Sequence, residues 1–264
     1  MKNFLKSLAY LGFYFVVQFV MQMIFMLFGR ISGMHSQEGL MEFSMNHLLL
    51  MTLVSNAVTL ILFTVFLKIR KKCIKEEWEL AAVGMKAYIA PCLSICLISF
   101  CWAFATYNVS FANAEQIEKS VVFYSGICPG LGTVLMAFSL LVAQPVMEEV
   151  LCRGIMLNTL KKSMPAWCAV LISALLFGVM HLMAGGVLLT IGAALIGIWL
   201  GIIFVKTRSL YVAVVAHAFA NLPDFILSYV PELENGIRIA LAAACALLSI
   251  VILVFTIKKK NENG

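Results

Sequence analysis

Charged residues are scarce in this sequence. Asp, Glu, Lys and Arg make up 12% of its 264 residues, whereas 62% are hydrophobic. Roughly 25% of the residues in an average soluble domain are charged. This shortage excludes an ordinary water-soluble domain, so lipid is the expected solvent for most of the chain.

The cysteines form no CxxC pair, although the chain has 8 of them. Cys92, Cys96, Cys101 and Cys245 lie inside apolar runs. This arrangement argues against a disulfide framework and against a structural zinc site. We expect the cysteines to act as apolar packing residues.

No segment alternates in the manner of an outer-membrane barrel strand. The sequence contains instead runs of about 20 apolar residues, the length that crosses a hydrocarbon core of about 30 Å. A backbone in lipid must satisfy its own hydrogen bonds, so these runs are helices. The sequence predicts an all-α, polytopic transmembrane helical bundle. Its candidate spans begin near Leu8, His47, Met85, Pro129, Pro165, Gly186, Ser209 and Gly236, about eight in all.

The N-terminal apolar run after Lys6 is too long for a signal peptide and ends in no small-residue cleavage site, so we expect it to be retained.

The net charge of +6 does not indicate nucleic-acid binding, because the basic residues cluster where helices meet one side of the membrane. Both termini are therefore predicted to be cytoplasmic. The clusters are Lys68, Arg70, Lys71, Lys72 and Lys75, then Lys161 and Lys162, then Lys206 and Arg208, then Lys258, Lys259 and Lys260.

We interpret residues 1–264 as one membrane domain without an internal repeat. Within it, residues 1–128 form structural N-terminal helices, residues 129–229 a catalytic helix core, and residues 230–264 a C-terminal helix with a basic tail. The core is singled out because ionisable side chains gather there at hydrocarbon depth, where each costs roughly 2.5 to 3.5 kcal/mol. These residues are Glu148, Glu149, Arg153, His181 and His217.

Glu149 and Arg153 are four residues apart on a predicted helix, so they share a face and form a natural ion pair. Glu148 points about 100° away from Glu149. A carboxylate beside an existing ion pair can be tuned for general-base work. The alternative is that all three residues only join helices together.

Two further pairs have the same spacing. Phe177 can pack beside His181 and orient its ring, while His217 and Asn221 bring two donors for an oxyanion to one face. Both pairs could instead be structural contacts between helices. Glu148 and His181 are expected at similar depths, roughly 20 to 24 Å along antiparallel helices from the turn near Lys162, so that they can face each other.

The strings EEVLCRG, FGVMH and HAFAN, which begin at Glu148, Phe177 and His217, resemble the three signature motifs of the CAAX protease and bacteriocin-processing family, in the same order. The resemblance covers about residues 130–225. It implies an intramembrane endopeptidase that cuts membrane-associated or lipidated peptides. By analogy, Glu148 activates water with help from His181, while His217 and Asn221 stabilise the oxyanion.

The resemblance further implies that Glu149 and Arg153 support the first motif, although Glu149 could share the base role. It also implies that no cofactor is needed. Two histidines and a glutamate are nevertheless a possible zinc set, and the absence of HExxH argues against it.

Two other classes of function compete with the protease: a proton-coupled transporter and a non-catalytic immunity or scaffold protein. The expected partners are the lipid bilayer and a peptide or lipidated protein, and not nucleic acid. The expected location is a bacterial plasma membrane, and the oligomeric state and the natural substrate are left open.

Overall fold

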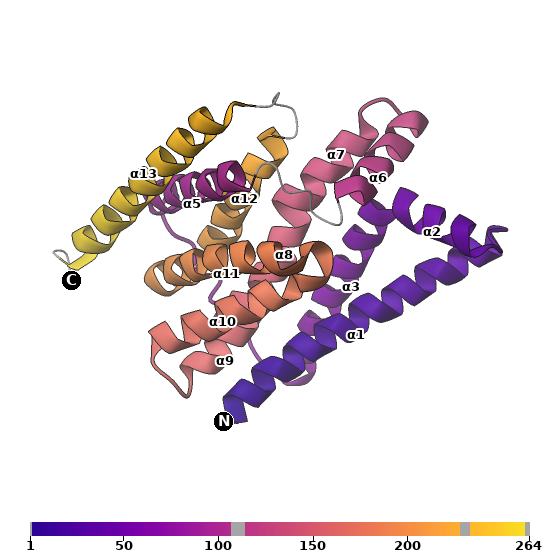
Figure 1. The fold of residues 1–264 in the computed structure, drawn as a ribbon. Helices are drawn as coiled ribbons and strands as arrows, with labels where there is room; N and C mark the ends of the chain where they lie inside the picture. The colour runs from indigo at the N-terminus through magenta and orange to yellow at the C-terminus, as the bar shows by residue number, and fades with distance from the viewer. Residues whose placement is uncertain (1, 107–113, 228–232, 262–264) are drawn as a thin grey trace.

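A computed structural model describes residues 2–106, 114–227 and 233–261 (Figure 1). Helices dominate these residues, so the predicted all-α class is confirmed. The first half contains α1 (Lys2–Ile31), α2 (Gln37–Asn46), α3 (Leu48–Ile69), α4 (Ile74–Glu77), α5 (Lys86–Ala105) and α6 (Ala114–Ile127). The second half contains α7 (Leu131–Phe138), η1 (Ser139–Ala143), α8 (Gln144–Glu149), η2 (Val150–Leu157), α9 (Asn158–Lys161), α10 (Ala166–Met180), α11 (Leu182–Thr207), α12 (Leu210–Leu227) and α13 (Asn235–Asn261).

Within the described ranges, 7 helical segments are long and apolar enough to cross a membrane. They are Lys2–Ile31, Leu48–Ile69, Lys86–Ala105, Leu131–Lys161, Gly185–Thr207, Leu210–Leu227 and Asn235–Ile252. The sequence predicted about eight, and the difference is α10, which has 15 residues. At 1.5 Å per residue it rises only about 22 Å, less than the roughly 30 Å of a hydrocarbon core. The cytoplasmic location of the termini stays a prediction.

The helices gather on two flanks of the long segment Leu131–Lys161 (Figure 1). Helices α1 and α3 pack against each other on one flank and contact η2 and α8 of this segment. On the other flank, α12 packs against α5, which also contacts α13. Helices α10 and α11 form the most extensive pair and lie against η2. The long segment is therefore held from several sides, which fixes the side chains that it carries.

Glycines allow α10 and α11 to approach each other closely. A Cβ on Gly178 would lie 2.7 Å from the carbonyl oxygen of Thr190, and one on Gly197 would lie 3.1 Å from Cα of Ala174. Small residues are the usual means by which membrane helices bring their backbones together. This approach holds α10, which carries Phe177 and ends just before His181, against α11.

We predict that Gly178→Ala destabilises the bundle by about 1–3 kcal/mol, because the added methyl group overpacks a backbone contact. Gly12→Ala is the matched control, because a Cβ there meets no atom within 4 Å. Alanine favours a helix over glycine by about 0.5–1 kcal/mol, so the control should be neutral or stabilised. Thermal unfolding in detergent measures both, and equal melting temperatures for the two variants would contradict the close packing.

The charged segment after α3 docks on the bundle. Lys161 forms an ion pair with Glu79 at 2.9 Å, and Leu80 forms an isolated antiparallel bridge with Ser209. The hydrogen bond that Lys72 donates to Glu77 lowers the pKa of that carboxyl. These contacts join the α4 region to the ends of α9 and α11, at the end of the bundle where basic residues concentrate.

Candidate active site

The first motif lies on one continuous helical segment that contains two π-helical stretches. The π-helical stretches η1 and η2 flank α8, and α8 ends with Glu148 and Glu149. Short π-helical insertions are frequent at functional sites because they re-aim side chains and free backbone groups. Here the first π-helical stretch frees a backbone carbonyl.

Pro145 and the π register together expose one backbone carbonyl. In η1 the N–H of Gln144 donates to the carbonyl of Ser139, so it does not reach that of Leu140. The next π-helical donor for Leu140 would be residue 145, which is proline and has no N–H. The amide Nδ2 of Asn221 donates to the Leu140 oxygen instead, at 2.8 Å. The third motif is thereby tied to the helix of the first.

Glu149 and Arg153 form the predicted ion pair, with 2.7 Å between Oε1 and Nη1. Their side chains are 0% and 1% exposed, so the pair is fully buried. Nη2 of Arg153 donates to the carbonyl of Gly197 at 2.8 Å, and the guanidinium lies 5.0 Å from the centre of the Phe177 ring. Buried charges require this kind of compensation, because an unpaired ion in an apolar interior is costly.

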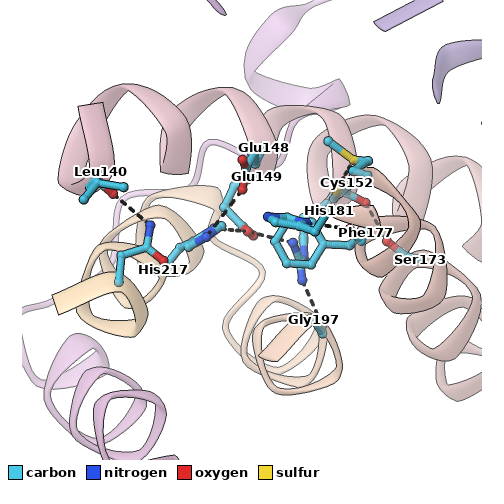
Figure 2. A network of polar contacts seen from close by, with 12 residues as sticks. Leu140, Glu148, Glu149, Cys152, Ser173, Phe177, His181, Gly197 and His217 are labelled. Carbon is cyan, nitrogen blue, oxygen red and sulfur yellow. Dashed lines mark hydrogen bonds and ion pairs between the residues drawn. The ribbon is translucent and has the colours of Figure 1, made fainter. Parts of the chain in front are cut away.

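His217 lies between the two glutamates, whose side chains point toward it in Figure 2. Its Nδ1 is 2.8 Å from Oε1 of Glu149, and its Nε2 is 3.5 Å from Oε2 of Glu148. The imidazole is 4% exposed and Glu148 is 14% exposed. Glu148 is therefore the more accessible of the two carboxylates.

Phe177 joins both histidines to this cluster. Its ring makes edge-to-face contacts with His181, at 4.7 Å between ring centres, and with His217, at 5.6 Å. The Nδ1–H of His181 donates a hydrogen bond to the carbonyl oxygen of Phe177 at 2.9 Å, because a carbonyl can only accept. Neutral His181 then has its lone pair on Nε2. The predicted contact between Phe177 and His181 is confirmed.

The chain therefore brings Glu148, Glu149, Arg153 and His217 into one polar cluster, with Phe177 beside it. Among the described residues, no hydrogen bond or ion pair joins His181 to Glu148. Asn221 is bonded to the Leu140 carbonyl and not to another predicted site residue. The expectation that Glu148 and His181 face each other directly thus finds no contact in the structure. The link between them runs through Phe177 and His217.

Sequence reasoning missed two backbone carbonyls that accept hydrogen bonds from predicted site residues. Leu140 accepts from Asn221, and Gly197 accepts from Arg153. Their sequence signals were indirect: Pro145 removes a donor, and the spacing of Gly197 and Gly201 allows a close helix approach. No group of three or more His, Cys, Asp or Glu residues in the described part of the chain is arranged to hold a metal ion.

The cluster can move a proton without changing its net charge. Arg153 balances the charge of Glu149, and Nε2 of His217 faces Glu148 across 3.5 Å. An imidazolium beside a carboxylate and a neutral imidazole beside a carboxylic acid have the same total charge. Such an arrangement suits general acid–base chemistry on a polar molecule bound next to Glu148.

Comparison with known proteins identifies the same region. Residues 130–223 match the family model described as Type II CAAX prenyl endopeptidase Rce1-like, which confirms the resemblance predicted from the three motifs. This is a family of proteases, so the match supports a hydrolase. The match and the apolar helices together indicate an integral membrane protein. No curated protein and no solved structure matches the chain.

Proposed function

We propose, from the match of residues 130–223 to the type II CAAX prenyl endopeptidase family, that this protein is an intramembrane endopeptidase that uses a water molecule activated by Glu148. Its substrates are membrane-associated or lipidated peptides, either C-termini of the CAAX type or peptide precursors such as bacteriocins. The membrane is that of a bacterial cell.

One observation carries the proposal. Glu148 is a partly exposed carboxylate at the edge of a fully buried ion pair, with an imidazole nitrogen 3.5 Å away. An ionisable side chain within a membrane helix is a candidate for function by default, because structural roles are served at lower cost by uncharged residues. A base that is accessible on one side and oriented by charged neighbours on the other is suited to taking a proton from water.

In the proposed reaction, Glu148 accepts a proton from water while the water oxygen bonds to the scissile carbonyl carbon. His181 orients this water, since the lone pair on Nε2 can accept its second hydrogen. The carbonyl π electrons move to oxygen and give a tetrahedral oxyanion. When the intermediate collapses, the C–N bond breaks and Glu148 returns its proton to the leaving amine, as microscopic reversibility requires.

His217 and Asn221 stabilise the oxyanion in this proposal. Protonation of Glu148 removes the negative charge that attracts Nε2–H of His217, which frees this donor for the oxyanion. One N–H of the Asn221 amide is held by the Leu140 carbonyl, and this bond orients the other N–H. Loss of one oxyanion donor typically lowers kcat by about 10²- to 10³-fold.

Glu149 and Arg153 act as positioning residues. Glu149 accepts from Nδ1 of His217 at 2.8 Å, which fixes both the orientation of the imidazole and the nitrogen that faces Glu148. Arg153 in turn fixes Glu149 and compensates its charge. In catalytic triads, too, a buried carboxylate accepts from Nδ1 of a histidine and orients its ring, as Glu149 does for His217.

The purified, detergent-solubilised protein should cleave members of a membrane-peptide library, and His181→Ala should lower kcat by about 10²-fold or more. Each assay is run with and without a zinc chelator. Activity that is lost in the variant and indifferent to chelator is the predicted result. Activity lost to chelator would favour the zinc-dependent form of the protease. A folded wild-type protein that cleaves no peptide in a broad library would favour the scaffold or transporter alternatives.

A further inference from the structure

Asp224 is an acidic residue that the proposed mechanism does not use, although it lies on the same helix as His217 and Asn221. It is the only Asp, Glu, Lys or Arg residue in α12, Leu210–Leu227. Measured along the helix from Leu210, it is about 21 Å away, within a hydrocarbon core of about 30 Å. An acidic side chain at such a position calls for a named partner.

Helical geometry places Asp224 on the active-site face of α12. It follows His217 by seven residues, which is a rotation of only about 20°, and Asn221 by three. The apolar residues that α12 exposes on its outer face lie about 140 to 180° away from Asp224. They are Tyr211, Val215, Phe219 and Ile226, which are 45%, 37%, 38% and 40% exposed. Asp224 is itself exposed, and helix geometry directs it to the side of α12 that carries His217, away from these apolar residues.

Exposure on this face rises in one direction. Ala213 and His217 are buried, Asn221 is partly buried, and Asp224 is exposed. The face of α12 that carries His217 is thus buried near the start of the helix and exposed near its end. Asp224 lies at this exposed end, on the same face as the two predicted oxyanion donors, His217 and Asn221.

No hydrogen bond or ion pair joins Asp224 to another residue in the part of the chain that the structure describes. The other charged residues of the site are already balanced, because Arg153 is paired with Glu149 and His217 lies between both glutamates. The cationic groups of this cluster are therefore already engaged with the two glutamates, and none of them is paired with Asp224.

We infer that Asp224 is a specificity-determining residue that binds a basic side chain, Lys or Arg, of the peptide substrate; this inference rests on the proposed protease function. Asp224 is about 4.5 Å beyond Asn221 and about 10.5 Å beyond His217 along the helix axis. An extended peptide advances about 3.3 Å per residue. The basic side chain is therefore two or three residues from the scissile bond.

The test uses quenched-fluorescence peptides, identical except for Lys, Gln or Glu at the second or third position on either side of the cleavage site. Wild-type protein in nanodiscs should show a kcat/KM about ten-fold or more higher for the best Lys peptide than for its Glu counterpart, because a like charge at a specific contact is strongly disfavoured. Asp224→Lys should reverse this order, and Asp224→Asn, which is nearly isosteric, should bring the ratio close to one.

Glu38→Lys is the matched control, since it makes the same change of charge at an exposed residue of α2. It should keep the wild-type order of peptides. If wild type cleaves the peptides but the Asp224 variants rank them as wild type does, the inference is wrong and the protease function stands. If folded wild-type protein cleaves none of them, the proposed function fails and the inference fails with it.

Discussion

Glu148→Gln is expected to lower kcat by about 10²- to 10⁴-fold, the usual contribution of general acid–base catalysis. Glutamine keeps the size and hydrogen-bonding capacity of the side chain but cannot take a proton from water. Glu148 is on the accessible side of the cluster and outside the buried ion pair, so the variant should fold with a melting temperature close to that of wild type. Single-turnover cleavage rates together with thermal unfolding measure both effects.

Glu149→Gln is the matched comparison, because it makes the same chemical change one residue away. This variant leaves Arg153 as a buried charge with its carboxylate partner removed, so it should lose stability as well as activity. The roles of the two glutamates would be reversed if Glu149→Gln were folded but inactive while Glu148→Gln kept wild-type activity.

Arg153→Met is expected to destabilise the protein by about 3–5 kcal/mol, because it removes one partner of a fully buried ion pair and leaves Glu149 uncompensated. The variant also loses the bond to the Gly197 carbonyl and the contact with the face of Phe177. Methionine is apolar and of similar length, so the loss of stability comes mainly from the removed charge and hydrogen bonds. Reversible unfolding in detergent measures the free-energy difference.

The double variant Glu149→Gln/Arg153→Met separates the contribution of the ion pair to stability from that of side-chain packing. Removing both charges should recover part of the loss, since neither partner is left buried and unpaired. The glutamine that replaces Glu149 can still accept from His217 through its amide oxygen. If the double variant lost as much unfolding free energy as the two single variants together, direct coupling between the two residues would be contradicted.

Sequence reasoning predicted the local pairs correctly. Glu149 with Arg153 and Phe177 with His181 follow from spacing alone, because residues four apart in a helical segment share a face whatever the rest of the fold does. The all-α class follows from the length of the apolar runs, since lipid permits few other backbones. The residue pairs thus depend on local helix geometry, and the fold class depends on lipid as the solvent.

The remaining features depend on tertiary structure. Neither the π register around α8 nor the carbonyl acceptors of Leu140 and Gly197 can be derived from side-chain identity, because they result from how helices press together. The depth estimate placed Glu148 and His181 at the same level, but it could not predict that the ring of Phe177, which packs on His181, would also contact His217. Asp224 was overlooked, although its seven-residue spacing from His217 could have revealed it.

The most direct test of the central claim, that Glu148 activates water for direct attack on a peptide bond, is a single-turnover cleavage in ¹⁸O-labelled water, analysed by mass spectrometry. The claim predicts one ¹⁸O atom in the new C-terminal carboxylate of the product, none in the protein, and cleavage at least about 10²-fold slower for Glu148→Gln. An ¹⁸O label on Glu148 after the first turnover would show that this residue acts as a nucleophile and would contradict the claim.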